Sequence, residues 1–276
     1  MPPAAHEPVP FAPWEIAATE EQRQAELIRD LGRESRPWCG GVASFDGSGS
    51  WVNQVINAGI DGPVTHDDVE EMAAWFEERG AEPKITMIPY AHPSLRESLG
   101  RAGFRLKTLE SLLVADLPAR SSHAPALPDG LTLGVVDKTD AASVETYVGL
   151  ASGVFFGESA SAELVDSLRK CVLDSRSTNL LLRDGDTPVG VCGVDTFRDL
   201  GALWGGAIAP SHRRRGLQRL LIERRLDLLR DRGLRWATIA SEPEIGTERN
   251  ALRAGMVPAY ARLELHRPGE GLVPSP

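Results

Sequence analysis

The sequence predicts a mixed α/β fold with a mixed sheet, in which helices and strands alternate along the chain. Three observations predict it. Apolar residues recur at helical spacing in segments such as 217–229, and they alternate or run together in strand-like segments such as 188–197. Between two of these apolar runs lies Asp184-Gly185-Asp186, and an Asp-Gly pair in that setting is typical of a β-hairpin turn.

The first half of the chain begins with a proline-rich stretch, residues 1–13, which we expect to be a tail. A charged segment with helical spacing follows, and then a Gly/Ser-rich strand and turn. Two later helices are expected because each has a polar capping residue at its start and a glycine at its end. The expected elements are a helix at 14–31, a strand and turn at 40–50, a helix at 65–79, a strand at 84–88, a helix at 94–102 and a strand at 108–117.

The second half contains the clearest helix, residues 216–232. Its broad apolar arc must be buried, Gly233 caps its C-terminus, and Arg230 and Arg232 suit the negative end of the helix dipole. The other expected elements are a strand at 131–136, helices at 140–156 and 160–171, a hairpin of 179–183 with 188–197, a strand at 203–209, a strand at 236–240, a helix at 247–254 and a strand at 260–266.

A linker rich in proline divides the two halves. Residues 118–130 combine prolines with small and polar residues, and this composition disfavours both helix and sheet. We therefore expect units at 14–118 and 131–267, a linker at 119–130 and a second tail at 268–276. Arg101-Ala-Gly-Phe104 near the end of the first unit resembles Arg253-Ala-Gly-Met256 near the end of the second, which suggests a duplicated fold.

Bulk properties exclude several classes of protein. The net charge is −9, which argues against a nucleic-acid-binding protein, because phosphate contacts need a basic surface. Cys39, Cys171 and Cys192 lie far apart without a CxxC spacing, so we expect neither disulfides nor a metal site, and a reducing compartment. The sequence has no signal-peptide pattern and no apolar run long enough to span a membrane, so a cytoplasmic location is expected.

One segment carries a chemical signal: the strand 203–209, the turn after it, and the start of the helix at 216. The first N–H groups of a helix have no partners within the helix, and the dipole makes that end positive, so it attracts anions. Gly216 allows the backbone to approach a pyrophosphate closely. Arg213, Arg214, Arg215 and Arg219 place four positive charges in seven residues of an acidic protein. Because basic residues are unfavourable at a positive helix end, a bound anion explains them better than a solvated face does.

The loop Arg213-x-x-Gly216-x-Gln218 resembles the acyl-CoA loop of GNAT acetyltransferases, usually written Q/R-x-x-G-x-G/A. Gln218 departs from the usual Gly or Ala. The stretch from Ile239 to Met256 resembles a second conserved block of that family. The resemblance covers about residues 131–267 and implies a GNAT N-acetyltransferase domain there. The first unit lacks the loop and resembles a degenerate repeat, so the expected fold is a tandem of GNAT-like acyl-CoA N-acyltransferase folds.

This resemblance implies acetyl-CoA as co-substrate. The strand 205–209 would pair its backbone with the pantetheine arm, residues 213–219 would hold the pyrophosphate, and Asn250 would lie near the cofactor arm. Gly205-Gly206 suggests a bulge or a close approach of the backbone to a ligand. The implied cofactor-binding residues are Ala207, Ile208, Ala209, Arg213, Arg214, Arg215, Gly216, Leu217, Gln218, Arg219 and Asn250.

The catalytic residues are less clearly marked. Direct attack of an amine on the thioester needs a base for the amine proton, and often an acid for the departing thiolate. Ala251 occupies the place where GNAT enzymes often have a tyrosine acid, so Tyr260 is the substitute candidate. Glu242 and Glu244, which follow the strand at 236–240, are the candidate bases.

The acceptor is expected to be an amine, of a small molecule or a peptide. Its identity and the oligomeric state cannot be read from the sequence. Tyr147, Phe155 and Phe156 could line an acceptor pocket, and His212 could contact phosphate. Two other classes of function fit the same residues: a CoA-binding protein without catalysis, and a module that binds an acidic partner through its arginines. A Rossmann-type nucleotide site is disfavoured, because no GxGxxG follows a strand.

Overall fold

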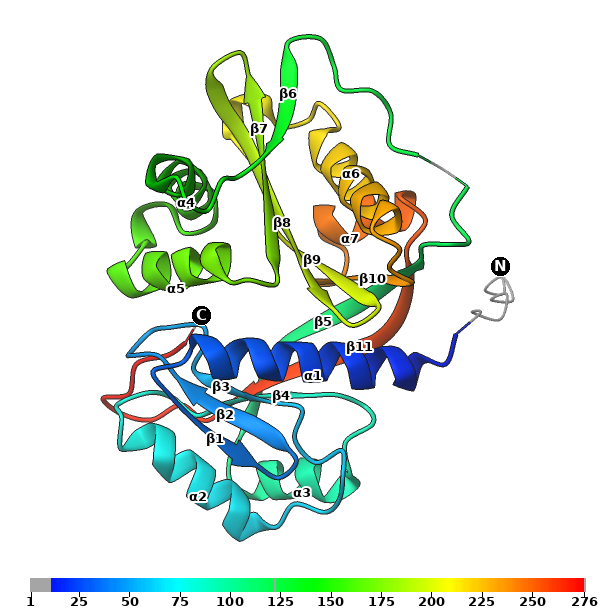
Figure 1. The fold of residues 1–276 in the computed structure, drawn as a ribbon. Helices are drawn as coiled ribbons and strands as arrows, with labels where there is room; N and C mark the ends of the chain where they lie inside the picture. Colours follow the sequence, from blue (N-terminus) through cyan, green and yellow to red (C-terminus); the bar gives the residue numbers. More distant parts are fainter. Residues whose placement is uncertain (1–10, 122, 276) are drawn as a thin grey trace.

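Over residues 11–121 and 123–275, the part of the chain that it describes, the computed structural model forms one mixed sheet of 11 strands (Figure 1). The strand order is β1-β2-β3-β4-β11-β5-β10-β9-β8-β7-β6. Most of the expected N-terminal tail, residues 1–10, lies outside the described residues. The predicted mixed α/β fold is confirmed. Within the described ranges, no helix has both the length and the apolar character needed to cross a bilayer.

The first half of the chain contributes five strands and three helices to the described structure. They are α1 (Pro13–Leu31), β1 (Glu34–Trp38), β2 (Gly41–Phe45), β3 (Gln54–Ile56), α2 (His66–Glu77), β4 (Lys84–Met87), α3 (Pro93–Arg101) and β5 (Arg105–Asp116). Strand β1 was not expected from the sequence, because it is polar and contains Pro37. Its position at the sheet edge explains why a proline is tolerated there.

The second half follows the expected order closely. Its elements are β6 (Leu131–Val135), α4 (Ala141–Phe155), α5 (Ala162–Leu173), β7 (Ser177–Asp184), β8 (Thr187–Phe197), β9 (Leu200–Ile208), α6 (Leu217–Asp231), β10 (Trp236–Ser241), α7 (Gly246–Arg253) and β11 (Val257–His266), with short 3-10 turns at Gly157–Ser159 and Pro210–His212. The predicted Asp-Gly hairpin is confirmed, since Asp184 pairs with Thr187 across the two-residue turn.

The two halves exchange their last strands. Strand β5 ends the first half but lies between β10 and β11, while β11 ends the second half and pairs with both β4 and β5. In each half a parallel pair of strands is joined by a helix: β3-α2-β4 in the first, β9-α6-β10 in the second. This correspondence supports the predicted duplication. The middle of the sheet therefore belongs to both halves.

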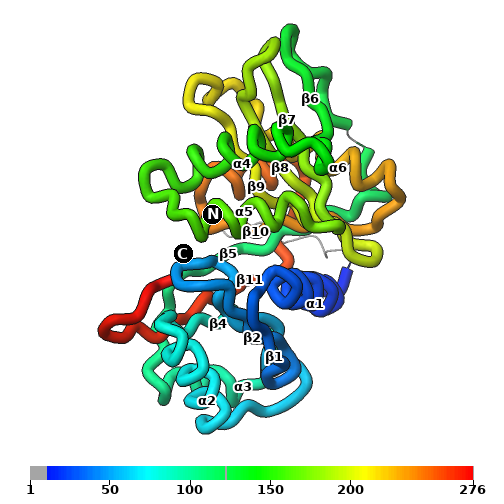
Figure 2. The backbone as a smooth tube through the Cα atoms, turned by 60° about the vertical axis from the view of Figure 1, so that its left-hand side comes forward, coloured from blue at the N-terminus to red at the C-terminus, as the bar shows by residue number. Residues whose placement is uncertain are grey.

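Helices cover both faces of this sheet. Side chains alternate along the strands: Leu181 and Ala207 pack toward α4 and α5, whereas Leu182 and Ile208 pack toward α6. Helix α1 contacts β2 and β3 as well as β9 and β11, and Figure 2 shows it lying along the middle of the molecule, between the two halves. The result is one continuous sheet, with α1 spanning the junction where the halves meet.

The C-terminal residues are held against the first half. The Val273 N–H donates to the Gly80 carbonyl, and the Glu82 N–H donates to the Val273 carbonyl. Lys107 Nζ donates to the Ser275 carbonyl. The segment expected as a second tail thus forms an isolated β-bridge, in which Val273 pairs with Ala81. Its composition did not predict that it would be held against the first half.

Candidate functional site

The turn between β9 and α6 has the backbone conformation of an anion site. Gly216 is the residue before the helix, with φ 75° and ψ 0°, a left-handed conformation that glycine adopts without strain. Arg214 is also left-handed, at φ 63°. No side chain of a described residue caps α6, so the N–H groups of its first turn are left for a ligand.

The arginines of this turn lack acidic partners. Within the described structure, Arg213, Arg214 and Arg215 form no ion pair, and all three are exposed. Only Arg219 has one, with Glu223 at 2.9 Å. Three adjacent cations beside a positive helix end repel one another, in a chain whose net charge is −9. An anionic ligand would relieve this repulsion.

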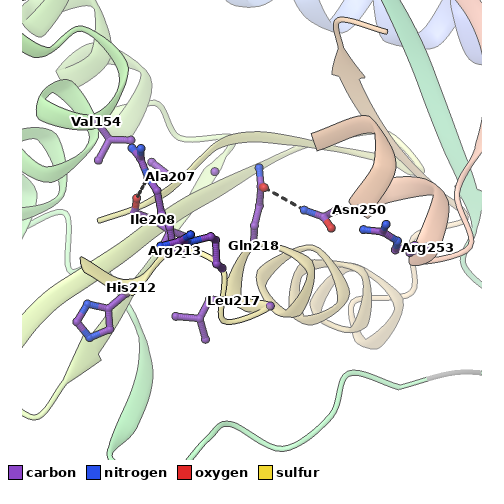
Figure 3. A pocket seen from close by; sticks show the side chains of 12 residues that line it. Val154, Ala207, Ile208, His212, Arg213, Leu217, Gln218, Asn250 and Arg253 are labelled. Atoms are coloured by element: carbon purple, nitrogen blue, oxygen red, sulfur yellow. Dashed lines mark hydrogen bonds between the residues drawn. The ribbon is translucent and has the colours of Figure 1, made fainter. Parts of the chain in front are cut away.

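A cavity of about 500 Å³ opens beside this turn (Figure 3). Eight of the eleven predicted cofactor-binding residues line it: Ala207, Ile208, Arg213, Arg214, Gly216, Leu217, Gln218 and Asn250. Arg215 and Arg219 instead line a neighbouring groove closed by residues 123–128, and Ala209 lines neither. Val154 and Arg253 also line the cavity. Sequence reasoning missed them, because nothing in the sequence indicates that α4 and the end of α7 both border this cavity.

Gln218, the departure from the usual loop sequence, has a specific role in the structure. Its Nε2 donates to Thr247 Oγ1 at 2.9 Å, and its Oε1 accepts from Asn250 Nδ2 at 3.0 Å. Figure 3 shows the side chain directed toward Asn250. Gln218 therefore connects α6 to α7 across the cavity, which a Gly or Ala could not do.

Beyond this cavity the strands β9 and β10 separate. They pair in parallel only as far as Leu203 with Ile239. Strand β9 then bulges: Val191 pairs with Ala207 and Gly193 with Trp204, so Gly205 and Gly206 together face Cys192. The predicted bulge at this glycine pair is confirmed. A smaller cavity of about 170 Å³ lies at this separation and shares Gly206 and Gln218 with the larger one.

Tyr260, the candidate acid, is 8% exposed on the sheet face that α1 covers. Its hydroxyl donates to Glu21 Oε1 at 2.6 Å, which also accepts from Arg262 Nε at 2.7 Å. Burial, together with the Glu21 carboxylate, raises the pKa of Tyr260 well above its usual value. Among the cavities described above, none has Tyr260 in its wall.

These contacts belong to a buried ionic network that the sequence did not reveal. Glu20 and Glu21 of α1 meet Arg262, and Arg23 reaches Asp195 at 3.2 Å. Burial alone would raise the pKa of Glu20, but Arg23 and Arg262 together lower it below its usual value. The network ties α1 to β8 and β11, and so joins the halves.

The other candidates are distributed around the site. Glu242 and Glu244 are exposed in the loop after β10, and the Glu244 backbone N–H donates to Glu248 Oε2. His212 lines the larger cavity, and its Nε2 lies 3.1 Å from Asp184. Phe155 lines the smaller cavity. Tyr147 is fully buried beside the bulge.

Comparison with known proteins agrees with this arrangement. Residues 146–246 match the model of the acetyltransferase (GNAT) family. No functionally curated protein sequence shows significant similarity to the chain. Among solved structures, a GCN5-related N-acetyltransferase from Kribbella flavida superposes with a TM-score of 0.69 at 18% identity, covering 92% of this chain and 95% of that one.

A second structure extends the likeness over the whole chain. A tandem GNAT protein from the clavulanic acid biosynthesis pathway superposes with a TM-score of 0.60 at 14% identity, covering 95% of this chain and 99% of that one. At such identities the likeness defines the fold, whereas the activity depends on the site. The chain therefore contains a GNAT-family domain in its C-terminal half, within the fold of a tandem GNAT protein.

Proposed function

We propose that this protein is an acetyl-CoA-dependent N-acetyltransferase that acts on an amine acceptor. The observation that carries the proposal is the uncapped, left-handed turn at Gly216, with the unpaired Arg213 and Arg214 in the wall of a cavity that adjoins the β9–β10 separation. Backbone N–H groups and arginine side chains are the donors that a pyrophosphate needs.

The chain's own residues would hold and orient the two substrates. Arg213 and Arg214, with the first N–H groups of α6, would bind the phosphates. The bulge at 205–206 would expose backbone to the thioester. The acceptor nitrogen attacks the thioester carbonyl carbon, the new C–N bond replaces the C–S bond, and the proton lost by the amine ends on the CoA thiol.

Thermal unfolding with acetyl-CoA, CoA and ATP tests the cofactor. A ligand at a hundredfold excess over its Kd stabilises the folded state by about 2.7 kcal/mol. We expect acetyl-CoA and CoA, but not ATP, to raise the melting temperature. The double substitution Arg213→Glu/Arg214→Glu should abolish this rise. The matched control is Arg96→Glu/Arg101→Glu, an equal change of charge on exposed residues of α3, which should retain it.

Turnover with an amine panel tests the reaction. Release of CoA, followed by chromatography, is expected with at least one amine and should be lost in the Arg213→Glu/Arg214→Glu variant. CoA binding without turnover of any amine would favour a non-catalytic CoA-binding protein. An equal rise in melting temperature with CoA, ATP and polyglutamate, which salt reduces, would favour a module that binds an acidic partner through its arginines.

A further inference from the structure

Arg225 is a buried cation at the active-site end of the cavity system. It lies on α6 and is 2% exposed. Its Nε donates to the Leu221 carbonyl at 3.1 Å, and its Nη1 donates to the carbonyls of Gly193 and Trp204 at 3.2 and 3.0 Å. Its Nη2 makes no hydrogen bond to any described residue. The side chain is therefore held firmly, with one donor group left over.

The charge of Arg225 is not balanced by a carboxylate. Two other buried arginines, Arg23 and Arg262, both pair with glutamates of α1. Arg225 forms no ion pair with an acidic side chain within residues 11–121 and 123–275, and burial lowers the pKa of its guanidinium. Removing a charge from water without an opposite charge beside it is unfavourable, so burial of Arg225 destabilises the fold unless a ligand supplies that charge.

The free end of Arg225 points to where a substrate would lie. Arg225 lines the smaller cavity at the β9–β10 separation. A β-carbon built at Gly206 would lie 3.3 Å from Nη2, and Gly206 lines both cavities. The absence of a side chain at position 206 thus keeps the guanidinium accessible from the cofactor side.

A second unsatisfied donor lies on the other side of the same bulge. Tyr147 of α4 is fully buried, and its hydroxyl has no hydrogen-bond partner in the described structure. A β-carbon built at Gly205 would lie 3.3 Å from that hydroxyl. Arg225 and Tyr147 therefore approach adjacent glycines from opposite faces of the sheet. Tyr147 lines neither cavity, so of the two unused donors only that of Arg225 faces the space where a substrate would lie.

We propose that Arg225 binds a carboxylate carried by a substrate of this site. A guanidinium matches a carboxylate in both charge and geometry. An acetyl group has no negative charge, so it would not explain a buried arginine at this position. The carboxylate would be carried by the acyl chain of the CoA thioester or by the amine acceptor. This inference rests on the proposed function, because it assigns the substrate class of the same site.

The unmodified protein tests the two sources separately. In the first arm, the affinity for succinyl-CoA is compared with that for butyryl-CoA, which has the same chain length without the carboxylate. In the second arm, kcat/KM with acetyl-CoA is compared between α-amino acids and their amides. We expect the carboxylate member to be favoured at least tenfold in one arm, since hydrogen bonds to a charged group are strong. That arm identifies the source.

Variants then test the residues. Arg225→Gln should remove the preference. Tyr147→Phe should leave it unchanged, because the deleted hydroxyl is enclosed on the opposite face of the sheet. Arg224→Gln, the adjacent position on α6, is the matched control and should keep the preference. If Arg225→Gln fails to fold, Arg225→Lys replaces it. Lysine keeps the charge without the paired donors of the guanidinium, so the preference should weaken at least severalfold, and an unchanged preference would contradict the inference.

Two results would overturn the inference, and they are distinguishable. If CoA thioesters bind but neither arm favours a carboxylate, Arg225 serves only to hold the carbonyls at the bulge, and the proposed function stands. If no CoA thioester binds at all, the proposed function fails, and the inference fails with it.

Discussion

Tyr260 stabilises the fold and does not face any of the cavities described above. Its hydroxyl satisfies one oxygen of Glu21, while Glu21 Oε2 has no hydrogen-bond partner in the described structure. A buried carboxylate that loses a donor keeps its desolvation cost without compensation. The contacts of Tyr260 thus favour a structural role.

Tyr260→Phe is expected to lower the free energy of unfolding by about 1–3 kcal/mol, because Glu21 loses a donor. Turnover should change little. Urea denaturation and steady-state kinetics measure the two effects. Tyr90→Phe is the control, since Tyr90 is 40% exposed and packs beside Tyr260. A large fall in kcat with unchanged stability would instead identify Tyr260 as the catalytic acid.

At the level of elements, the exchanged strand β11 joins β4 through a buried ion pair. Lys84 Nζ lies 3.5 Å from Glu264, and the Lys84 side chain is only 3% exposed. Burial lowers the pKa of Lys84 to about 8, despite the nearby carboxylate. The unfolded chain therefore binds more protons than the folded chain between about pH 8 and the usual lysine pKa, near 10.4.

It follows that the contribution of Lys84 to stability increases with pH in this range. The difference in unfolding free energy between the unmodified protein and Lys84→Met should grow by about 3 kcal/mol from pH 7 to pH 10.5. Urea denaturation of both proteins at the two pH values measures it. A difference that is constant or falls with pH would contradict the lowered pKa.

Helix α2 is the counterpart of α6 in the first half, but its N-terminus is already satisfied. The Thr65 hydroxyl accepts from the Asp68 N–H, and the Asp68 carboxylate accepts from the Thr65 N–H. Asp67 adds further negative charge to the first turn. A helix end that is capped by its own side chains and is acidic disfavours a pyrophosphate.

Isothermal titration with CoA should therefore give one site per chain, and the Arg213→Glu/Arg214→Glu variant should give none. A stoichiometry of two would place a second site in the first half and contradict the argument from α2. Residual binding in the variant at the original affinity would show that the cofactor binds away from α6.

The sequence predicted features that depend on neighbouring residues and missed those that depend on distant ones. Gly216 and the arginines before it could be read locally, because a helix start and its charges lie within one short segment. The exchange of strands could not be predicted in this way, because β11 is far from β4 in the sequence. The lack of an acidic partner for Arg225 could not be predicted either. Arg224 and Arg225 are neighbouring arginines, and only the packing of α6 shows which of the two is buried.

For the molecule as a whole, strand exchange implies that the halves are stable only together. Without β11, strands β4 and β5 have no common neighbour, and without β5 the same holds for β10 and β11. The boundaries predicted at 14–118 and 131–267 would then mark units of sequence that do not fold alone.

We expect a single cooperative unfolding transition. Variants that keep tryptophan only in the first half, such as Trp75, or only in the second, such as Trp204, should report the same midpoint in urea. Each variant's midpoint is compared with that obtained by circular dichroism on the same sample. Two separate midpoints would show that the halves are independent in spite of the shared sheet.

The exchange of strands also sets the order of events during synthesis on the ribosome. Lys84 pairs with His266, which is translated about 180 residues later. At roughly 5–20 residues per second, the first half must wait on the order of 10–40 s for its missing strand. During that time the edges of β4 and β5 are open to other chains. A nascent chain of this protein would therefore expose unpaired strand edges until β11 is translated, and slower translation of the second half would lengthen that exposure.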